Sequence, residues 1–526
     1  MTDALTLLHR ADELHLAQQL EEATAAYRGA LTLDENLVDA WYGLGCCHLE
    51  RRSYGAAAVA LNRATTLRPD AAGARCNLAE ALFQLGRVDD AVQHYITAAD
   101  SGHPEVAQIS LDALACIAPG APSLDNAAIL ALRQHWASKV ARNVVPLTPA
   151  SHDPSRKLRI GYVSAFFGAR NWMKPVFGVI NHHDRTRFEI HMLSDGDDPS
   201  EASGYVDHPQ DYIWQTNLIS NEQLAQRIAE SGIDVLVDLN CYTVQRRLPL
   251  FMQRAARCQI AWFNAYATTG MSCFDRVVAD AATLPPDEEA YCCERIHRVS
   301  GSYLSFDVRY PVPDVAPPPC LRNGHLTFGC LGSSYKLTDT TIEAWSRILL
   351  ATPDTQLLLK NSRLDDASSR SALLARFATH GIAEHRLELD GAEEHFDFLR
   401  AYDRIDIALD TFPYNGGTTT MEALWQGVPV LTFNGDRWAS RTSRSLLLAA
   451  GLSDWVANSA TGFIDAATRL ARAPDTPKRL ATMRGSMREH LRASAACDCA
   501  TLCRELEALY IELATEGPVT VSKAKQ

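Results

Sequence analysis

The first hundred residues repeat one pattern of small and bulky apolar positions three times. Small residues recur 34 positions apart, as Ala11, Gly45 and Ala79, as Ala23, Ala57 and Ala91, and as Ala30, Ala64 and Ala98. A bulkier side chain recurs at the same interval, as Tyr27, Leu61 and Tyr95. Small residues at these spacings let two antiparallel helices approach closely, and the bulky residue fills the groove between them. The pattern predicts three helical hairpins over residues 5–104.

Two further helices and a domain boundary follow the repeats. Amphipathic patterns predict helices over residues 105–117 and 125–141, and the proline-containing polar stretch 145–157 indicates a boundary. We therefore assign residues 1–144 to a helical repeat domain. Its concave surface favours recognition of a protein or peptide. A scaffold or a dimerisation element is the alternative, because three repeats are close to the minimum for stability and leave a short groove.

From residue 158 onward the pattern changes to short β-branched runs that alternate with amphipathic helices. The runs predict strands at 158–163, 188–193, 233–239, 259–263 and 276–279. Such alternation is typical of a mainly parallel sheet covered on both faces. Residues 311–319 hold five prolines and cannot continue a helix or a central strand. They indicate a connector, so residues 157–312 form a first α/β lobe.

A second lobe, residues 322–515, repeats this organisation, and residues 516–526 are expected to be a disordered tail. Its strands are predicted at 326–330, 356–359, 387–389, 405–409 and 428–433. The fold class is therefore α/β with an all-α N-terminal repeat array, in which two doubly wound lobes face each other. Ligands of such sheets bind beyond the carboxyl ends of the strands, so the functional site is expected in the cleft between the lobes.

Composition narrows the classes of partner. The chain has 526 residues, 47% of them apolar, and a formal charge of −13, which disfavours general attraction to nucleic acid or to anionic membranes. No apolar run approaches the roughly 18 to 20 residues of a membrane span, and no signal peptide is evident, so we expect a cytoplasmic protein. The fourteen cysteines are interpreted as reduced packing residues, including the trio Cys497, Cys499 and Cys503, which lacks metal-ligand spacing.

The clearest candidate site follows the strand predicted at 405–409. A glycine-rich turn with Asn415, Gly416 and Gly417 leads through Thr418 and Thr419 into a helix predicted at 421–426. The glycines allow close approach of a ligand, and the threonine hydroxyls with the free N–H groups of the helix start can bind an anion such as a diphosphate. Glu422, one turn along, can accept hydrogen bonds from a ribose diol. The alternative is an ordinary helix cap with a surface glutamate.

The same segment carries a resemblance to a known family. Residues 415–429 (NGGTTTMEALWQGVP) closely resemble the O-GlcNAc transferase family of inverting glycosyltransferases, and the 34-residue units resemble tetratricopeptide repeats. Further similar stretches are LRIGYVS at 158–164, VDLNCYT at 237–243, TTG at 268–270, SYK at 334–336 and ASR at 439–441. The resemblance runs in order along nearly the whole chain. It implies the family's architecture, tetratricopeptide repeats followed by two Rossmann-like lobes of the GT-B type.

The resemblance also implies roles for individual residues. Lys336 matches the family lysine at the nucleotide diphosphate, with a surface lysine as the alternative, and His395 matches a histidine that lies against the nucleoside, with an exposed helix histidine as the alternative. Thr418 and Thr419 match phosphate-binding threonines. Glu422 stands where the family has an acidic residue on the ribose. Lys336 is thus expected to act on the departing UDP, since a compact ammonium suits a leaving diphosphate.

Two departures from the family pattern concern the acceptor side of the site. The family commonly has Asp-Phe followed by His-Pro after the first strand, whereas this chain has Ala165-Phe166 and then Lys174-Pro175, and Gly417 replaces a histidine found in many members. Lys174 is a candidate catalytic residue, but it accepts a proton only if it is neutral. Arg170 is a possible helper, and a structural role is favoured for His182 and His183. Further candidates to line the cleft are Asn171, Trp172, Tyr242 and Thr243.

The leading hypothesis is an inverting glycosyltransferase that moves a sugar from a UDP donor, most plausibly UDP-GlcNAc, to Ser or Thr of a protein. No metal or other cofactor is expected, because Lys336, the threonines and the helix start can stabilise the diphosphate, and Asp195-Gly196-Asp197 is interpreted as a polar turn. One alternative is transfer of a UDP-hexose to Asn or to a non-protein glycan. Another is a non-catalytic adaptor that binds a nucleotide sugar. The sequence does not determine the oligomeric state.

Overall fold

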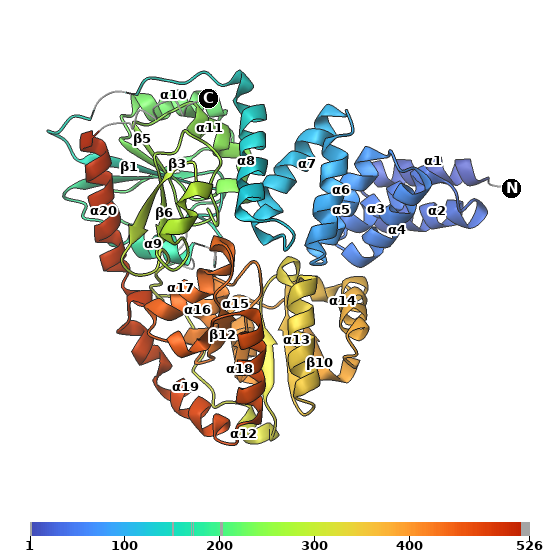
Figure 1. Ribbon diagram of the computed structural model, residues 1–526. Helices are drawn as coiled ribbons and strands as arrows, with labels where there is room; N and C mark the ends of the chain where they lie inside the picture. Colours follow the sequence, from blue (N-terminus) through green and yellow to red (C-terminus); the bar gives the residue numbers. More distant parts are fainter. Residues whose placement is uncertain (1–2, 150–151, 170, 172, 200–203, 517–526) are drawn as a thin grey trace.

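The computed structural model describes residues 3–149, 152–169, 171, 173–199 and 204–516. Its N-terminal part is an array of antiparallel helices that projects sideways from two stacked lobes (Figure 1). The helices of the array are α1 (Ala4–Leu16), α2 (Leu20–Leu33), α3 (Val38–Glu50), α4 (Tyr54–Leu67), α5 (Ala72–Gln84), α6 (Val88–Ala99), α7 (Pro104–Ile117) and α8 (Asn126–Val140). The first six form the three expected hairpins, and α7 and α8 connect the array to the lobes.

The repeated small and bulky positions make the helix contacts that their spacing predicted. The small and bulky residues of the 34-residue pattern are all buried. A Cβ atom at Gly45 would lie 2.5 Å from Leu61 Cγ, so the glycine permits the approach of α3 and α4. The burial of these positions therefore confirms that the first hundred residues form a helical repeat array.

The first lobe is a seven-stranded parallel sheet with the order β3-β2-β1-β4-β5-β6-β7. Its strands are β1 (Leu158–Ser164), β2 (Phe188–Ser194), β3 (Tyr212–Gln215), β4 (Val235–Asp238), β5 (Cys258–Ala261), β6 (Arg276–Asp280) and β7 (Arg295–Val299). Its helices are α9 (Lys174–Ile180), α10 (Asn221–Glu230) and α11 (Leu248–Met252). The inner strands β4, β5 and β6 are buried throughout, as is usual for parallel strands covered on both faces.

The second lobe is a six-stranded parallel sheet with the order β10-β9-β8-β11-β12-β13. Its strands are β8 (Thr327–Cys330), β9 (Gln356–Lys360), β10 (Leu387–Asp390), β11 (Ile407–Leu409), β12 (Val430–Phe433) and β13 (Val456–Ala457). Its helices are α12 (Cys320–Asn323), α13 (Asp339–Ala351), α14 (Ala367–Thr379), α15 (His395–Arg400), α16 (Thr418–Trp425), α17 (Thr442–Ala449), α18 (Ala460–Arg472) and α19 (Thr476–Arg492). This is the strand order of a Rossmann fold.

Three strands were not predicted from the sequence, and each lies at or near a sheet edge. Three of the four residues of β3 are exposed, β7 is rich in Arg and His, and β13 has only two residues. An edge strand packs on one side only, so its residues need not be β-branched or apolar. The hydrophobic pattern therefore identifies the inner strands of both sheets and misses these three.

The last helix corrects the expected domain boundary. Helix α20 (Cys499–Glu516) belongs by sequence to the second lobe, but it crosses back and lies along the first (Figure 1). Tyr510 and Tyr162 share a hydrogen bond of 3.0 Å, and His183 Nδ1 lies 3.0 Å from Glu507 Oε1. Glu516 ends this helix, whereas the rest of the expected tail, residues 517–526, lies outside the described residues. The C-terminal helix therefore ties the two lobes together.

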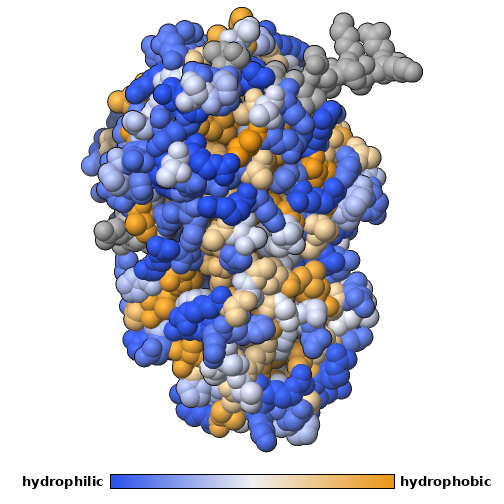
Figure 2. All heavy atoms as spheres, turned by 90° about the vertical axis from the view of Figure 1, so that its left-hand side faces the viewer, coloured by the Kyte–Doolittle hydropathy of each residue, from blue (hydrophilic) through white to orange (hydrophobic). Residues whose placement is uncertain are grey.

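The polarity of the surface and the state of the cysteines match what the composition led us to expect. Polar side chains cover most of the face that carries α20, and apolar residues form small groups there (Figure 2). Within the described ranges, no helix is long and apolar enough to cross a membrane. All fourteen cysteines are free thiols. Cys503 lies near His183 and Glu507 rather than in a cluster with Cys497 and Cys499.

Candidate functional site

A pocket opens where the order of strands in the second lobe reverses. The chain runs from β8 to one edge of the sheet, then returns to β11 and runs to the other edge, so the loops after β8 and β11 separate and leave a crevice. Lys336 follows β8, and residues 415–419 follow β11. The two stretches that the sequence analysis singled out therefore meet at one end of the sheet.

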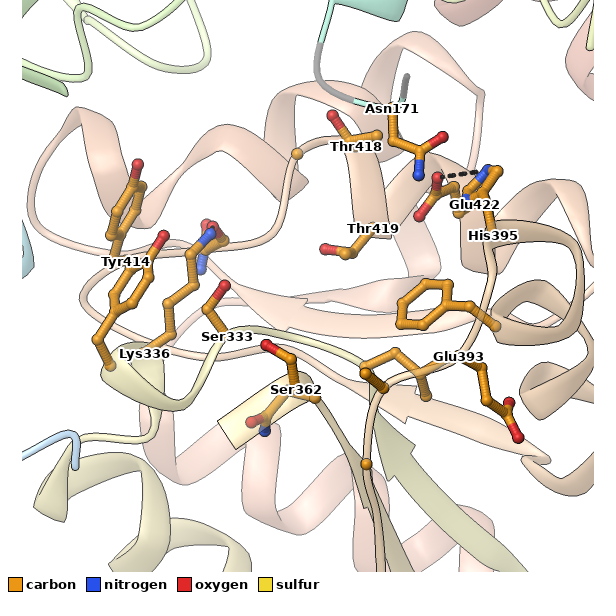
Figure 3. A pocket seen from close by; sticks show the side chains of 18 of the residues that line it. Asn171, Ser333, Lys336, Ser362, Glu393, His395, Tyr414, Thr418, Thr419 and Glu422 are labelled. Carbon is orange, nitrogen blue, oxygen red and sulfur yellow. Dashed lines mark hydrogen bonds and ion pairs between the residues drawn. The ribbon is translucent and has the colours of Figure 1, made fainter. Parts of the chain in front are cut away.

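The pocket has a volume of about 380 Å³, in the range of small-molecule sites. It is lined by eight of the predicted residues: Asn171 of the first lobe and, in the second, Lys336, His395, Asn415, Gly417, Thr418, Thr419 and Glu422. Gly416 lines a smaller cavity directly beneath the glycine-rich loop. Phe263 and Tyr266 of the first lobe also line it, so the pocket lies between the lobes. In Figure 3, Lys336 and Glu422 stand on opposite sides, with Thr418 and Thr419 between them.

A buried aspartate shapes the glycine-rich loop. Asp410 Oδ1 accepts hydrogen bonds from the N–H groups of Thr411, at 2.9 Å, and Gly416, at 3.0 Å, while Oδ2 accepts one from Thr432 Oγ1 at 2.7 Å. A Cβ atom at Gly416 would lie 2.5 Å from Thr420 Oγ1, so only glycine fits there. The loop is thus fixed by contacts within the protein before any ligand binds.

The helix after this loop starts earlier than the sequence predicted. We expected a helix over 421–426, but α16 runs from Thr418 to Trp425 with Gly417 as its N-cap. Threonine is a moderate helix former, yet Thr418 and Thr419 occupy the first turn because the Asp410-bound loop directs the chain into it. Their N–H groups lie in the part of a helix that has no partner within the helix, and the macrodipole is positive there. The N-terminus of α16 therefore presents donors and hydroxyls to the pocket.

Lys336 reaches across from the loop after β8 to the loop after β11. It ends a short 3-10 turn, Ser334–Lys336, and its Nζ donates a hydrogen bond of 2.7 Å to the backbone oxygen of Asn415. The ammonium also lies 4.1 Å from the centroid of the Tyr414 ring. Burial lowers the pKa of Lys336 to about 8, and the nearby charge of Asp410 limits this shift. The Asn415 oxygen and the Tyr414 ring thus hold the positive charge of Lys336 in place.

The opposite side of the pocket holds a charged cluster that spans the two lobes. Lys174, at the start of α9, is almost fully buried, and its Nζ lies 2.7 Å from Glu422 Oε1 and 2.9 Å from His395 Nε2. The ammonium also lies 3.9 Å from the centroid of the Tyr310 ring. Lys174 is not among the described residues that line the pocket. Its position thus differs from that of a base exposed to an acceptor.

Burial dominates the proton equilibria of this cluster. It lowers the pKa of Lys174 and raises the pKa of Glu422, and the opposite charge of the partner limits each shift. Burial, aided by the Lys174 charge, lowers the pKa of His395 to about 4, so this ring is neutral near pH 7. A neutral imidazole accepts a hydrogen bond from the Lys174 ammonium through Nε2. The sequence analysis expected the Glu422 carboxylate to face a ribose. In the structure its Oε1 already accepts a hydrogen bond from Lys174.

Other sequence candidates take structural positions. Tyr242 is buried away from the pocket, where its ring packs against Trp136 and its hydroxyl donates to the backbone oxygen of Thr269. This corrects the expectation that Tyr242 lines the cleft, and Thr243 likewise does not line it in the described part of the chain. His182 lies 2.6 Å from the Gly178 oxygen, which confirms a structural role, as the Glu507 contact does for His183. Arg170 and Trp172 lie outside the described residues.

The aspartate pair after β2 is a turn, as the sequence analysis expected. Both carboxylate oxygens of Asp195 accept hydrogen bonds of 2.6 Å from the Arg247 guanidinium, and Oδ1 also accepts one from Thr216. A Cβ atom at Gly196 would lie 2.4 Å from the Ala165 oxygen, so this glycine packs tightly against the loop after β1. The carboxylate of Asp195 is therefore committed to protein contacts.

Several residues that line the pocket were missed from the sequence. They include Tyr335 and Tyr414 beside Lys336, Asn361, whose Oδ1 accepts a hydrogen bond from Ser334 of the Lys336 turn, and Ser362 and Phe398. Tyr335 and Tyr414 adjoin residues that were singled out, so the motifs themselves held a signal for them. Asn361 and Ser362 follow β9, and only the neighbouring position of β9 and β8 brings them to the pocket.

The fold and the site together define the class of the protein. Two Rossmann-like lobes with a pocket between them, and a helix N-terminus of the C-terminal lobe that faces this pocket, form a GT-B glycosyltransferase fold. Residues 138–315 and 320–506 match the sequence profile of glycosyl transferase family 41, and residues 48–109 match a tetratricopeptide repeat profile. The chain belongs to glycosyl transferase family 41.

Individual relatives agree with this assignment. The chain is 30% identical, over 365 residues, to the probable UDP-N-acetylglucosamine–peptide N-acetylglucosaminyltransferase SPINDLY of Solanum lycopersicum. The aligned residues cover 68% of this chain and 39% of that protein. It is 22% identical to the UDP-N-acetylglucosamine–peptide N-acetylglucosaminyltransferase of Caenorhabditis elegans, over 73% of this chain and 44% of the other. It thus spans about two fifths of the length of these relatives.

A solved structure matches over almost the full length. The structure of a lysine-to-methionine mutant of Thermobaculum terrenum O-GlcNAc transferase superposes with a TM-score of 0.80 at 32% identity, covering 98% of this chain and 97% of the other. The match includes the helical array as well as both lobes. The architecture expected from the resemblance, repeats followed by a GT-B pair, is therefore confirmed.

Proposed function

We propose that this chain is an inverting glycosyltransferase that moves N-acetylglucosamine from UDP-GlcNAc to Ser or Thr side chains of proteins. One observation carries the proposal: Lys336, the glycine-rich loop and the N-terminus of α16 converge on one pocket that faces the first lobe. A nucleoside diphosphate sugar has the charge and the size for that pocket. The printed names of the plant and nematode relatives support the choice of sugar and of a peptide acceptor.

The proposed chemistry uses the second lobe to stabilise the leaving group. The hydroxyl oxygen of the acceptor attacks the anomeric carbon from the side opposite to UDP, the bond from that carbon to the diphosphate breaks, and the configuration inverts. The hydroxyl proton passes to a phosphate oxygen of the UDP-sugar. Negative charge then builds on the departing diphosphate. The Lys336 ammonium, the hydroxyls of Thr418 and Thr419, and the N–H groups of α16 stabilise this charge, with about 3 kcal/mol from each well-placed donor.

The remaining pocket residues suit the other parts of the donor and the acceptor. His395, which is neutral near pH 7, is proposed to lie against the nucleoside. Glu422 is proposed to accept a hydrogen bond from the ribose while its Oε1 stays bound to Lys174. Asn171 of the first lobe lies beside Thr418 and Glu422 (Figure 3), and we propose that it contacts the sugar or the acceptor. We do not propose Lys174 as the base, because its ammonium is bound to a carboxylate and an imidazole.

Transfer is proposed to need no metal ion, since protein groups supply the positive charge at the diphosphate. Asp410 and Asp195, the carboxylates that follow β11 and β2, are engaged in hydrogen bonds to the protein. EDTA is therefore expected to leave the rate of UDP release unchanged. A rate that falls with EDTA and returns with Mg²⁺ or Mn²⁺ would contradict this part of the proposal.

The pKa of Lys336 gives a prediction for the pH dependence. The ammonium form is present below about pH 8 and is lost as the pH rises through that value. We expect kcat/KM for the UDP-sugar, which reports the free enzyme, to fall tenfold per pH unit at higher pH. Bound diphosphate opposes loss of the proton, so the descending limb of kcat is expected at higher pH. Initial rates of UDP release across the alkaline range test this, and a flat kcat/KM contradicts it.

The test of the function itself uses the purified chain with radiolabelled UDP-GlcNAc and cell lysate. We expect UDP release and label in protein that alkaline β-elimination removes, as it does for sugars linked to Ser or Thr. Label that resists β-elimination and that mass spectrometry of the peptides localises to Asn would indicate transfer to Asn. Label in a polysaccharide fraction would contradict the proposal that the acceptor is a protein. Tight binding of UDP without turnover of any UDP-sugar would indicate a binding adaptor.

A further inference from the structure

The third helical repeat lies directly against the turn that carries Lys336. The Phe83 ring of α5 stacks on Tyr335, with 5.0 Å between ring centroids and an interplanar angle of 20°. Tyr335 is in turn 6.2 Å from Tyr414, the ring over which the Lys336 ammonium lies. A row of aromatic rings thus connects the helical array to the immediate surroundings of Lys336.

The end of α5 makes an even closer contact with the same turn. Gly86, just after α5, would place a Cβ atom 2.3 Å from the backbone oxygen of Leu337 and 2.9 Å from that of Ser334. Arg376 of α14 fastens this contact, because it donates hydrogen bonds to the backbone oxygens of Leu85, at 2.6 Å, and Leu337, at 2.7 Å. The array and the lobe therefore meet backbone to backbone on the Ser334–Lys336 turn.

The repeats themselves show why residue 86 is a glycine. The equivalent positions of the first and second repeats, 34 residues apart, are Gln18 and Arg52, and all three residues have positive φ angles, 60°, 58° and 79°. The turn thus accepts a side chain in the left-handed conformation. Gln18 and Arg52 are exposed, whereas Gly86 is buried against the second lobe. The absence of a side chain at this position therefore serves the contact with the Lys336 turn rather than the fold of the repeat.

We propose that the third repeat is part of the donor site, with Gly86 and Phe83 as positioning residues that hold the Ser334–Lys336 turn and thereby the Lys336 ammonium. This inference rests on the proposed role of Lys336 at the diphosphate. A displaced ammonium loses charge stabilisation mainly when charge develops on the leaving group, so the loss falls on kcat more than on KM. The helical array thus has a part in sugar transfer apart from any acceptor it binds.

The test replaces Gly86 by the residue that the first repeat carries there. Gly86→Gln keeps a turn that Gln18 already adopts, but its side chain collides with the carbonyl of Leu337. We expect kcat for UDP-sugar turnover to fall about 30-fold while KM changes less than about threefold. The matched control is Arg52→Gln, at the equivalent exposed turn, with an unchanged kcat. A kcat for Gly86→Gln within about twofold of the unmodified chain overturns the inference.

A second pair of variants avoids the backbone. Phe83→Ala removes the ring stacked on Tyr335, and we expect kcat to fall about tenfold. Leu49→Ala, at the equivalent position of the second repeat, is its control and is expected to leave kcat unchanged. Thermal unfolding of all four variants separates displacement of the turn from loss of the fold. Equal losses of kcat in Phe83→Ala and Leu49→Ala would also overturn the inference.

Two further readouts identify Lys336 as the group that is moved. In a Lys336→Ala background, Gly86→Gln is expected to change kcat by less than about twofold, because both changes act on the same ammonium. A further large loss in that background would refute positioning through Lys336. Labelling of Lys336 by an amine-reactive reagent, followed by mass spectrometry, is expected to rise in Gly86→Gln and not in Arg52→Gln. Unchanged labelling of Lys336 in Gly86→Gln would also refute the inference.

The labelling does not depend on turnover, so it separates the two hypotheses. If the chain turns over no UDP-sugar, the proposed function fails. If Lys336→Ala is fully active, the proposed role of Lys336 at the diphosphate fails. In both cases labelling of Lys336 still reports whether Gly86 holds the turn. If the chain and Lys336→Ala behave as expected but Gly86→Gln keeps its kcat, only the positioning role fails.

Discussion

Lys336→Ala is expected to lower kcat for sugar transfer about 100- to 1000-fold, the loss that follows removal of one donor to a developing anion in a preorganised site. The ammonium is fixed by the Asn415 oxygen and the Tyr414 ring, so no reorganisation is needed when charge moves onto the diphosphate. Steady-state release of UDP from UDP-GlcNAc measures the effect. The fold should persist, because the side chain reaches into a pocket rather than the core.

The control for this variant is Lys478→Ala, which removes an exposed lysine of α19. It is expected to leave kcat and KM unchanged, which shows that the loss in Lys336→Ala is not an effect of net charge. Near-normal turnover by Lys336→Ala would show that this lysine does not act on the diphosphate, and the proposed mechanism would have to be abandoned.

Lys174→Met is expected to lower the free energy of unfolding by about 3 kcal/mol. The reason is that the buried Glu422 carboxylate loses the ammonium that neutralises it. Chemical denaturation measures this loss. With its partner removed, Glu422 has a pKa in the folded state above its usual 4.5. The defect is then small in acid, where Glu422 is protonated in both states. It grows as the pH rises toward the raised folded-state pKa of the variant and levels off above that pKa.

A second substitution separates the charge from the packing of Lys174. Glu422→Gln in the Lys174→Met background is expected to recover much of the lost stability and to remove its pH dependence, because no buried charge remains to be paired. The matched control for side-chain length is Lys478→Met on the surface of α19. A Lys174→Met defect that is independent of pH, or that the second substitution does not relieve, would refute the ion pair as the source of the stability.

The sequence predicted the fold through patterns that are local. The 34-residue register of small residues determines which helix faces pack, because each repeat contacts only its neighbours. The inner strands of both lobes were found because burial on both faces makes them continuously apolar. Strands β3, β7 and β13 were missed because edge positions impose no such pattern.

The candidate site was predicted in part. The loop from Asn415 to Thr419 and its helix lie within one strand-loop-helix unit, so short-range sequence identifies them. The order of strands then brings Lys336 to the same edge of the sheet. The start of α16 at Thr418 was not predicted, because it depends on hydrogen bonds from the loop to Asp410.

The sequence alone determined the repeat register, the two sheets with their inner strands, and the glycine-rich loop that we propose to bind the diphosphate. These features follow from residues close together in the chain, whose spacing is directly visible. Only the tertiary structure decided that Lys174 pairs with Glu422, that α20 returns to the first lobe, and that Gly86 presses on the turn of Lys336. Such contacts join residues hundreds of positions apart, and many weak packing terms from the whole chain determine them together.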